Sequence, residues 1–324
     1  MKASSSLPRR AIALAALACM LPLHGLAAAA DWPHEKPITW IVGFAPGGSL
    51  DVLTRLAARR LSEKTGQPVV VDNRPGASGV IALQAAAKAT PDGYTLISIP
   101  GPILFNQRPP ELGKELVAVA RIAEGPMVLV GPAAAPTSTV AELLAAMRAT
   151  PKAWSYASSG NGTSQHLAGE LFNITAGTAM THIPYKGGGQ AVTDVVGGQV
   201  PLAILGVTPV LPQIKAGKLK AYAVTSSYRI ESLPEVPTMQ EAGLKGYEAT
   251  QWYVVGAPAG TPAARVTQLN AWINEIMASS ELRPALVSSG SIAGKGSARD
   301  TQAFVAAETN KWKDIAHKSG LALD

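Results

Sequence analysis

Residues 154–167 read WSYASSGNGTSQHL and change character halfway along. The first residues favour a strand, and the last ones open an amphipathic helix. Between them lies a loop of small residues, and its hydroxyl donors are Ser158, Ser159, Thr163 and Ser164. The first turn of a helix has unpaired N–H groups and the positive end of the helix dipole. The segment therefore predicts a strand, loop and helix that can bind a carboxylate or phosphate without a metal or an arginine.

A second junction of the same kind lies near the start of the chain. Residues 38–44 favour a strand, and residues 45–51, APGGSLD, form a loop that opens a helix. Two loops of small donors suggest one ligand held between them. The alternative is that each loop is an ordinary turn, in which glycine supplies positive φ and Ser or Asp caps the helix.

The N-terminal residues have the pattern of a secretory signal. Lys2, Arg9 and Arg10 precede an apolar run over 11–21, and four alanines at 27–30 precede Asp31. We expect residues 1–30 to be a signal peptide cleaved after Ala30. The alternative is a lipoprotein anchored through Cys19, which follows a weak lipoprotein box. Beyond this segment, no apolar run reaches the ~20 residues that a membrane-spanning helix needs.

Cleavage would change both the charge and the thiol content. The chain has 28 lysines and arginines against 22 acidic residues, a net charge of +6, and loss of residues 1–30 removes three of the cations and no acid, leaving +3. This small excess argues against nucleic-acid binding. The only cysteine, Cys19, lies in the removed segment. The mature chain is therefore expected to have no disulfide and no thiolate-bound metal.

Strand-like and helix-like segments alternate along the mature chain, which predicts α/β layers with mostly parallel sheets. A capping box, Thr139 with Glu142, marks one helix start. The apolar runs 127–130 and 252–257 bracket a middle segment with its own strands and helices. We therefore predict one domain from residues 31–124 with 251–324, and a second, inserted domain from residues 125–250.

Catalytic and metal-binding motifs are missing from the sequence. There is no G-x-S-x-G, phosphate-loop, H-E-x-x-H or G-x-G-x-x-G pattern, and the histidines lack metal-ligand spacing. We therefore expect no metal and no cofactor. His166, in a first helical turn, could donate to a ligand or be an ordinary core histidine. Asp51 could cap its helix, or orient the Gly47–Gly48 loop and accept from a ligand.

Seven short blocks together resemble one family. They are FAPGGS at 44–49, DNRPGA at 72–77, PDGYTL at 91–96, YASSGNGTS at 156–164, PYKG at 184–187, IKAGKL at 214–219 and PEVPT at 234–238. In this order, over residues 37–313, the chain resembles the Bug-type receptors of tripartite tricarboxylate transporters. The alternative is an α/β hydrolase that uses a hydroxyl of residues 158–164 with His166 as base, but it lacks a third catalytic group.

The resemblance implies a monomeric periplasmic receptor and no enzyme activity. Such receptors resemble type II periplasmic binding proteins: two α/β domains close like a flytrap on a small carboxylate, which is passed to a membrane permease. Backbone amides, hydroxyls and ordered waters hold the carboxylate. The loops and the resemblance together assign these residues to the ligand: Phe44, Ala45, Pro46, Gly47, Gly48, Ser49, Asp51, Gly101, Ser158, Ser159, Asn161, Gly162, Thr163, His166, Tyr185 and Leu205.

Two departures from the family pattern concern the pocket. Residues 204–206 read ILG where many members have a Phe-Asp-Asn type of turn, so Leu205 replaces a carboxylate that commonly lies beside the ligand. We therefore expect an aliphatic or aromatic mono- or dicarboxylate without an amino group. The second departure is IPGP at residues 99–102, followed by a shortened stretch up to Leu116, which predicts a pocket rim that is stiffer or differently shaped than in other members.

Overall fold

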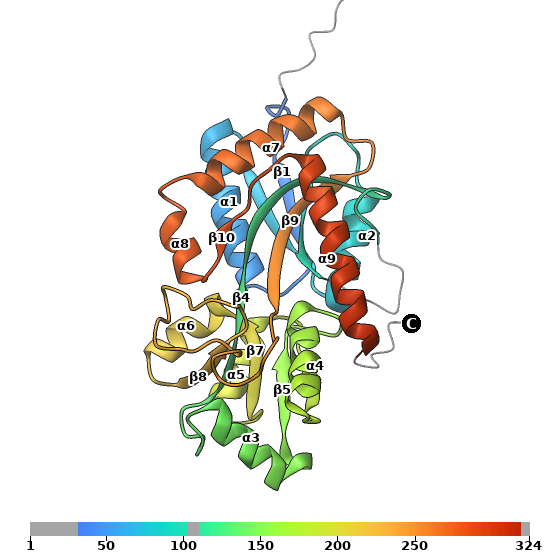
Figure 1. Cartoon of the computed structure of the whole chain (residues 1–324). Helices are drawn as coiled ribbons and strands as arrows, with labels where there is room; N and C mark the ends of the chain where they lie inside the picture. The colour runs from blue at the N-terminus through green and yellow to red at the C-terminus, as the bar shows by residue number, and fades with distance from the viewer. Residues whose placement is uncertain (1–31, 103–109, 319–324) are drawn as a thin grey trace, which may run out of the picture.

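The computed structural model describes residues 32–102 and 110–318, and Figure 1 shows two lobes stacked end to end. The expected signal peptide, Cys19 and residues 103–109, part of the stretch for which a changed pocket rim is predicted, lie outside the described residues. One path of strands, β2-β1-β3-β9-β4-β7-β5-β6, runs through both lobes, and β8 and β10 pair with β4 beside it. The fold is the two-domain α/β flytrap that the sequence predicts.

The first lobe holds the two ends of the described chain. Its elements are β1 (Ile38–Val42), α1 (Ser49–Thr65), β2 (Val69–Asn73), the 3-10 turn η1 (Ala77–Gly79), α2 (Val80–Ala87), β3 (Thr95–Gly101), the first part of β4 (Leu116–Pro132), β9 (Thr250–Pro258), α7 (Ala263–Ala278), α8 (Arg283–Ser288), β10 (Ile292–Ala293) and α9 (Ala298–Lys318). Strand β1 is apolar along most of its length because helices cover both of its faces. Helix α1 buries Leu53, Ala57 and Leu61 at helical spacing and ends at Gly66, whose φ is 68°.

The second lobe repeats the strand-helix pattern. Its elements are the rest of β4, α3 (Val140–Ala149), the 3-10 turn η2 (Pro151–Ala153), β5 (Ser155–Ser158), α4 (Ser164–Ala176), β6 (Thr181–Pro184), α5 (Gly188–Val196), β7 (Leu202–Gly206), α6 (Val207–Lys215) and β8 (Leu219–Val224). The predicted capping box is formed, since Thr139 Oγ1 accepts from the amide of Glu142 and the Glu142 carboxylate accepts from the amide of Thr139.

Strand β4 joins the lobes. It pairs with β9 over Leu116–Pro126 and with β7 and β8 over Met127–Pro132. Strands β2, β1 and β3 are parallel, as are β6, β5 and β7, whereas β4 and β9 are antiparallel to their neighbours. The predicted parallel pairing is therefore found within each βαβ series. Strands β4 and β9, which run between the lobes, pair antiparallel instead.

The last helix packs against both lobes. In Figure 1, α9 runs down one side of the molecule and ends beside α4. Phe304 packs on the first-lobe cluster around Trp252, and Trp312 is fully buried with Tyr156 and Phe172 of the second lobe. Among the described helices, none combines the length and apolar content needed to cross a membrane.

Candidate functional site

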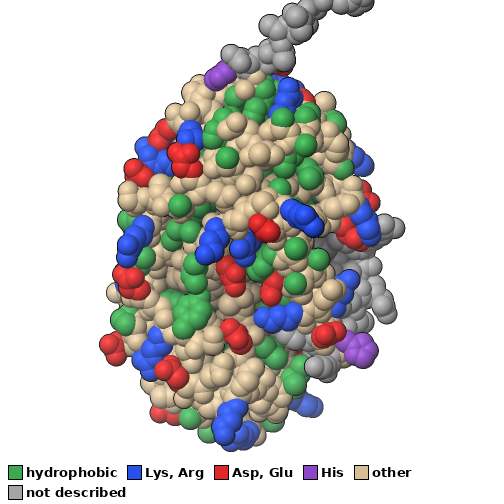
Figure 2. Space-filling view, turned by 45° about the horizontal axis from the view of Figure 1, so that its top comes forward, with side chains coloured by type: hydrophobic (Ala, Val, Ile, Leu, Met, Phe, Trp, Pro, Cys, Tyr) green, Lys and Arg blue, Asp and Glu red, His purple; other side chains and the backbone are tan. Residues whose placement is uncertain are grey.

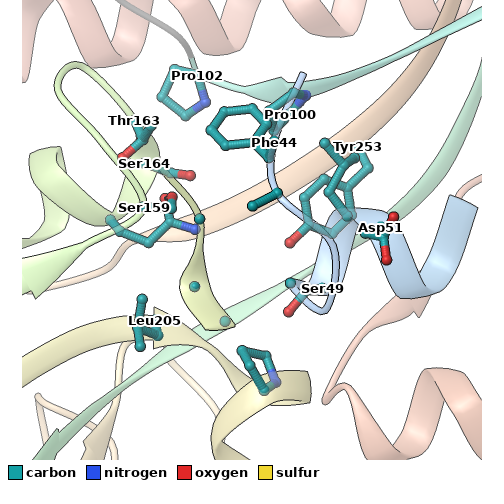
Figure 3. Close-up of a pocket in the computed structure, with 18 residues that line it drawn as sticks. Phe44, Ser49, Asp51, Pro100, Pro102, Ser159, Thr163, Ser164, Leu205 and Tyr253 are labelled. Atoms are coloured by element: carbon teal, nitrogen blue, oxygen red, sulfur yellow. Dashed lines mark hydrogen bonds between the residues drawn. The ribbon is translucent and has the colours of Figure 1, made fainter. Parts of the chain in front are cut away.

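A cavity lies where the two lobes meet, and residues of both line it (Figure 3). The space between its walls, open mouth included, is about 530 Å³. Its lining residues are Phe44, Ala45, Gly48, Ser49, Leu50, Asp51, Pro100, Pro102, Ser159, Thr163, Ser164, Gln165, Gly187, Gly188, Leu205, Gly206, Pro209 and Tyr253.

Four helices begin at this cavity. The lining residues Gly48, Thr163, Gly187 and Gly206 are the N-caps of α1, α4, α5 and α6, respectively. Each helix directs the positive end of its dipole and its unpaired first-turn amides to the same region. No lysine, arginine or histidine lines the cavity among the described residues. An anion bound here would therefore be stabilised by backbone dipoles and hydroxyls.

The two loops found in the sequence line the same cavity, and a third loop contacts the first of them. The amide of Ala45, in the loop after β1, donates to the carbonyl of Lys186, in the loop after β6, at 3.1 Å. Figure 3 shows Ser49 and Tyr253 on one side of the cavity and Ser159, Thr163 and Ser164 on the other. The loops therefore border one cavity between the lobes.

Three of the predicted hydroxyl donors have already used their protons. Ser159 Oγ donates to Gln165 Oε1 at 2.8 Å, and Thr163 Oγ1 donates to the carbonyl of Gly160 at 2.7 Å. Ser158 is fully buried, and its Oγ contacts Gly160 and lies 2.6 Å from His182 Nε2. Because a hydroxyl has a single proton, none of these three can donate to a ligand without breaking a bond that holds the loop.

Two other serines keep their protons free. Ser49 Oγ is buried and makes no hydrogen bond among the described residues. Burial raises the pKa of the nearby Tyr253 hydroxyl, and Ser49 lowers that pKa in part. Ser164, the first residue of α4, also has no side-chain hydrogen bond within the described part of the chain, and both serines line the cavity. They are the hydroxyls best placed to donate to an anion.

Asp51 is a supporting residue of the first loop. Its carboxylate accepts from the amide of Gly47 at 3.1 Å and from the side chains of Arg55 and Asn73. Burial raises the pKa of Asp51, but these three partners together outweigh burial and hold the pKa below its ordinary value. Of the two roles predicted for Asp51, orientation of the loop is the one that the contacts bear out.

His166 is not among the residues that line the cavity, and its role as a ligand donor stays a prediction. Its Nδ1 accepts from the amide of Gly162 at 3.1 Å, and its ring stacks on His182 at 3.8 Å between centroids. Burial lowers the pKa of His166 to about 4, so the ring is neutral near pH 7 and its 3.9 Å approach to Glu170 is no ion pair. The hydrolase alternative required a His166–serine pair, whereas the serine that contacts a histidine, Ser158, contacts His182 and is buried.

Seven other predicted ligand residues also lie outside the cavity lining: Pro46, Gly47, Gly101, Ser158, Asn161, Gly162 and Tyr185. Each has a structural reason where the contacts are known. Gly101 packs on the Trp252 ring, since a Cβ there would lie 1.9 Å from it. The Tyr185 hydroxyl donates to Asp194 at 2.5 Å, and Gly162 donates to His166.

Nine lining residues were predicted from the sequence neither as donors nor as ligand residues: Leu50, Pro100, Pro102, Gln165, Gly187, Gly188, Gly206, Pro209 and Tyr253. A tenth, Ser164, was predicted as a hydroxyl donor of the loop but was not assigned to the ligand, and Gln165 could have been found because it follows Ser164 at the start of the same helix. Gly187 and Gly188 likewise open α5. Tyr253 carried no signal, since it lies inside an apolar strand whose buried and cavity-facing residues look alike in sequence.

The chain matches the model of the tripartite tricarboxylate transporter family receptor over residues 53–321. It is 38% identical over 319 residues to Protein BugT of Bordetella pertussis, covering 96% of this chain and 98% of that protein. The structure is similar to that of Rpa4515 of R. palustris with adipate. The two sequences are 36% identical, and the TM-score is 0.87 over 90% of this chain and 99% of that one.

Two further structures are similar. The periplasmic binding protein BugD is 31% identical, with a TM-score of 0.84 over 89% of this chain and 98% of that one. MatC of Rhodopseudomonas palustris with bound malate is 28% identical, with a TM-score of 0.80 over 87% of this chain and 99% of that one. The cavity, the fold and these matches agree, and the chain belongs to the Bug-type receptors of the tripartite tricarboxylate transporter family, which are periplasmic solute-binding proteins.

Proposed function

We propose that this protein binds a small carboxylate in the cavity between its lobes and delivers it to the membrane permease of a tripartite transporter. The observation that carries this proposal is the convergence of four helix N-termini on a cavity that no basic side chain of the described residues lines. The helix N-termini attract negative charge through their backbone groups. The adipate and malate in two similar structures support the same ligand class.

The ligand is proposed to lack an amino group. An ammonium would need a carboxylate partner, but Leu205 is apolar and Asp51 is held by Arg55 and Asn73. Figure 3 shows Asp51 on α1, on the far side of the view from Ser159. Phe44, Pro100, Pro102, Leu205 and Pro209 give the cavity apolar walls. These features favour an aliphatic or aromatic mono- or dicarboxylate.

The domain division remains as proposed from the sequence: residues 31–124 with 251–324, and residues 125–250 inserted. The change of β4 partners between Pro126 and Met127 supports the first boundary, and the pairing of β9 from Thr250 supports the second. The end of α9 is an exception, because Trp312 packs in the second-lobe core. Binding would close the domains by adding contacts from both loops to one ligand.

Export is proposed through residues 1–30 as a cleaved signal, giving a monomer that acts in the periplasm, with lipidation at Cys19 as the alternative. Interaction with nucleic acid is not part of the proposal. In Figure 2, basic and acidic side chains are interspersed over the visible face, without a basic patch.

Thermal unfolding of the mature chain from Asp31 tests the proposal. Adipate, malate and aromatic carboxylates are compared with amino acids of matched length. A ligand that binds only the folded state raises the unfolding midpoint with concentration. We expect a rise with at least one plain carboxylate and recovery of the ligand unchanged. A rise with amino acids alone, or turnover of a carboxylic ester, would contradict the proposal.

Substitution of the two free hydroxyls locates the site. Ser49→Ala and Ser164→Ala should each weaken carboxylate binding about fivefold, because each loses a hydrogen bond of about 1 kcal/mol. The control is Ser288→Ala, an exposed serine of α8. Ser159→Ala and Thr163→Ala are less informative, since both disturb the loop itself. Unchanged affinity in both test variants would mean that the ligand binds elsewhere.

A further inference from the structure

A chain of side-chain hydrogen bonds leads from the cavity wall into the interior. Ser159 Oγ donates to Gln165 Oε1, and Gln165 Nε2 donates to Gln251 Oε1, both at 2.8 Å. Gln251 Nε2 then donates to the carbonyl of Pro126 at 3.4 Å. Ser159 and Gln165 line the cavity, whereas Gln251 does not and is only 2% exposed.

The chain ends at the crossing between the lobes. Gln251 lies opposite Gly125 in the β4–β9 pair. The next residue of β4, Pro126, is the last to pair with β9, and from Met127 onward β4 pairs with β7. Thr225 links the same two segments, β4 and the residues just before β9, through its side chain. Its Oγ1 accepts from the amide of Met127 at 2.8 Å and donates to the carbonyl of Ala249 at 2.6 Å. The two strands that connect the lobes are therefore tied together where Gln251 sits.

Gln251 also touches the junction of two cavity helices. A Cβ placed on Gly206, the N-cap of α6, would lie 2.5 Å from Gln251 Nε2 and 2.4 Å from Ser49 Oγ of α1. The amide of Gln251 is thus packed against the end of β7 while it bonds Gln165. Few interior side chains could fill this position, because it needs an acceptor toward Gln165 and a donor toward Pro126.

We infer that Gln251 is a positioning residue for the ligand: it holds Gln165, and through it Ser159, in register with the strands that cross between the lobes. The second-lobe loop is then set by the geometry of the crossing, so that ligand affinity depends on a side chain outside the cavity. This inference rests on the proposed function, in that the cavity is taken as the ligand site.

Hydrogen exchange of the ligand-free mature protein tests the structural part. Gln251→Leu leaves the Gln165 amide and the Pro126 carbonyl unpaired in the interior. We expect exchange in residues 159–167 to become about tenfold faster, the effect of one unpaired buried group. The matched control is Asn270→Leu, because the Asn270 amide also donates to a β4 carbonyl, that of Val119, but in the first lobe. The control should leave residues 159–167 unchanged.

Titration with adipate tests the functional part. Gln251→Leu should raise the adipate Kd about tenfold, and Gln251→Glu should do the same at pH 8, because a carboxylate cannot donate to Pro126. Near pH 5 the buried carboxyl of the second variant is protonated and can donate again. Its Kd should then approach that of the wild type at the same pH, and that of the leucine variant should not.

The outcomes separate the inference from the proposed function. A wild-type protein that binds neither adipate nor any other carboxylate overturns the proposed function, and exchange in residues 159–167 then decides the role of Gln251 by itself. A wild type that binds, together with variants of equal affinity and unchanged exchange, overturns the inference.

Discussion

Two stacked imidazoles support the second loop at the scale of single residues. The pKa of His166 is lowered to about 4 by burial, and that of His182 to about 3 by burial and then by its neighbour. As neutral rings they accept or share hydrogen bonds with Gly162 and Ser158. A proton on His166 Nδ1 would turn an acceptor into a donor that faces an amide. The loop geometry therefore depends on both rings staying neutral.

Stability should fall in mild acid because of this pair. In the unfolded chain a histidine titrates near 6.5, so below that pH the unfolded state binds more protons than the folded state. The midpoint temperature of unfolding should fall as the pH is lowered from about 6.5 toward 4. It should level off once the pH is below the folded-state pKa values of the two histidines. Circular dichroism melts measure this, and the double variant His166→Asn, His182→Asn should give a flatter profile. If the exposed His34→Asn flattens the profile equally, the pair is not the cause.

Helix starts organise the site at the scale of elements. Three of the four helices around the cavity have a glycine N-cap, at Gly48, Gly187 and Gly206, which leaves room for the loops to approach each other. Gly206 has a φ of −58°, which any residue adopts. Its need for glycine is therefore one of space, because Ser49 of the other lobe lies against it.

Gly206→Ala should weaken binding without unfolding the protein. The added methyl group would lie 2.4 Å from Ser49 Oγ of the other lobe and 2.5 Å from Gln251 Nε2 at the strand crossing, and overpacking of this kind costs about 1–3 kcal/mol. We expect the Kd for a carboxylate to rise at least fivefold by calorimetry, with a lowered melting midpoint but a folded protein. Gly197→Ala is the control, since its φ is also negative and its Cβ would make only ordinary contacts, at 3.4 Å. Equal affinities for the two variants would rule out the steric argument.

The last helix links the cores of the whole molecule. Helix α9 contributes Phe304 to a first-lobe cluster and Trp312 to the main second-lobe cluster. It is a connection between the lobes that is separate from the strands β4 and β9. Relative motion of the lobes must therefore be accommodated by this helix as well as by the crossing strands.

Trp312→Ala should be among the most destabilising substitutions in the chain. Loss of a fully buried tryptophan costs about 3–5 kcal/mol, measurable by urea denaturation. Trp312→Phe should cost less, because it keeps most of the volume and removes an indole N–H that has no partner among the described residues. Lys313→Ala, exposed on the same helix, is the control. A cost below about 1 kcal/mol for alanine would show that α9 is not packed in solution.

Local signals in the chain predicted much of the fold. The Thr139–Glu142 box and the alternation of strands and helices depend on neighbours in sequence, and both are found. The run at 127–130 marked the crossing strand but not its extent, because β4 begins at Leu116 in the other lobe. Long-range pairing with β9 decides that extent, since Arg121, Glu124, Gly125 and Pro126 interrupt the apolar content of the strand before Met127.

The sequence by itself determined the family, the α/β layers and the two loops that border the cavity, because each follows from short motifs and periodicity. Only the tertiary structure decided which hydroxyls remain free to donate. Ser49 and Ser164 keep their protons, whereas Ser159 gives its own to Gln165, which bonds a glutamine 86 residues away. A hydrogen bond uses up a donor wherever its partner lies along the chain, so the donor count of a site is a property of the folded molecule.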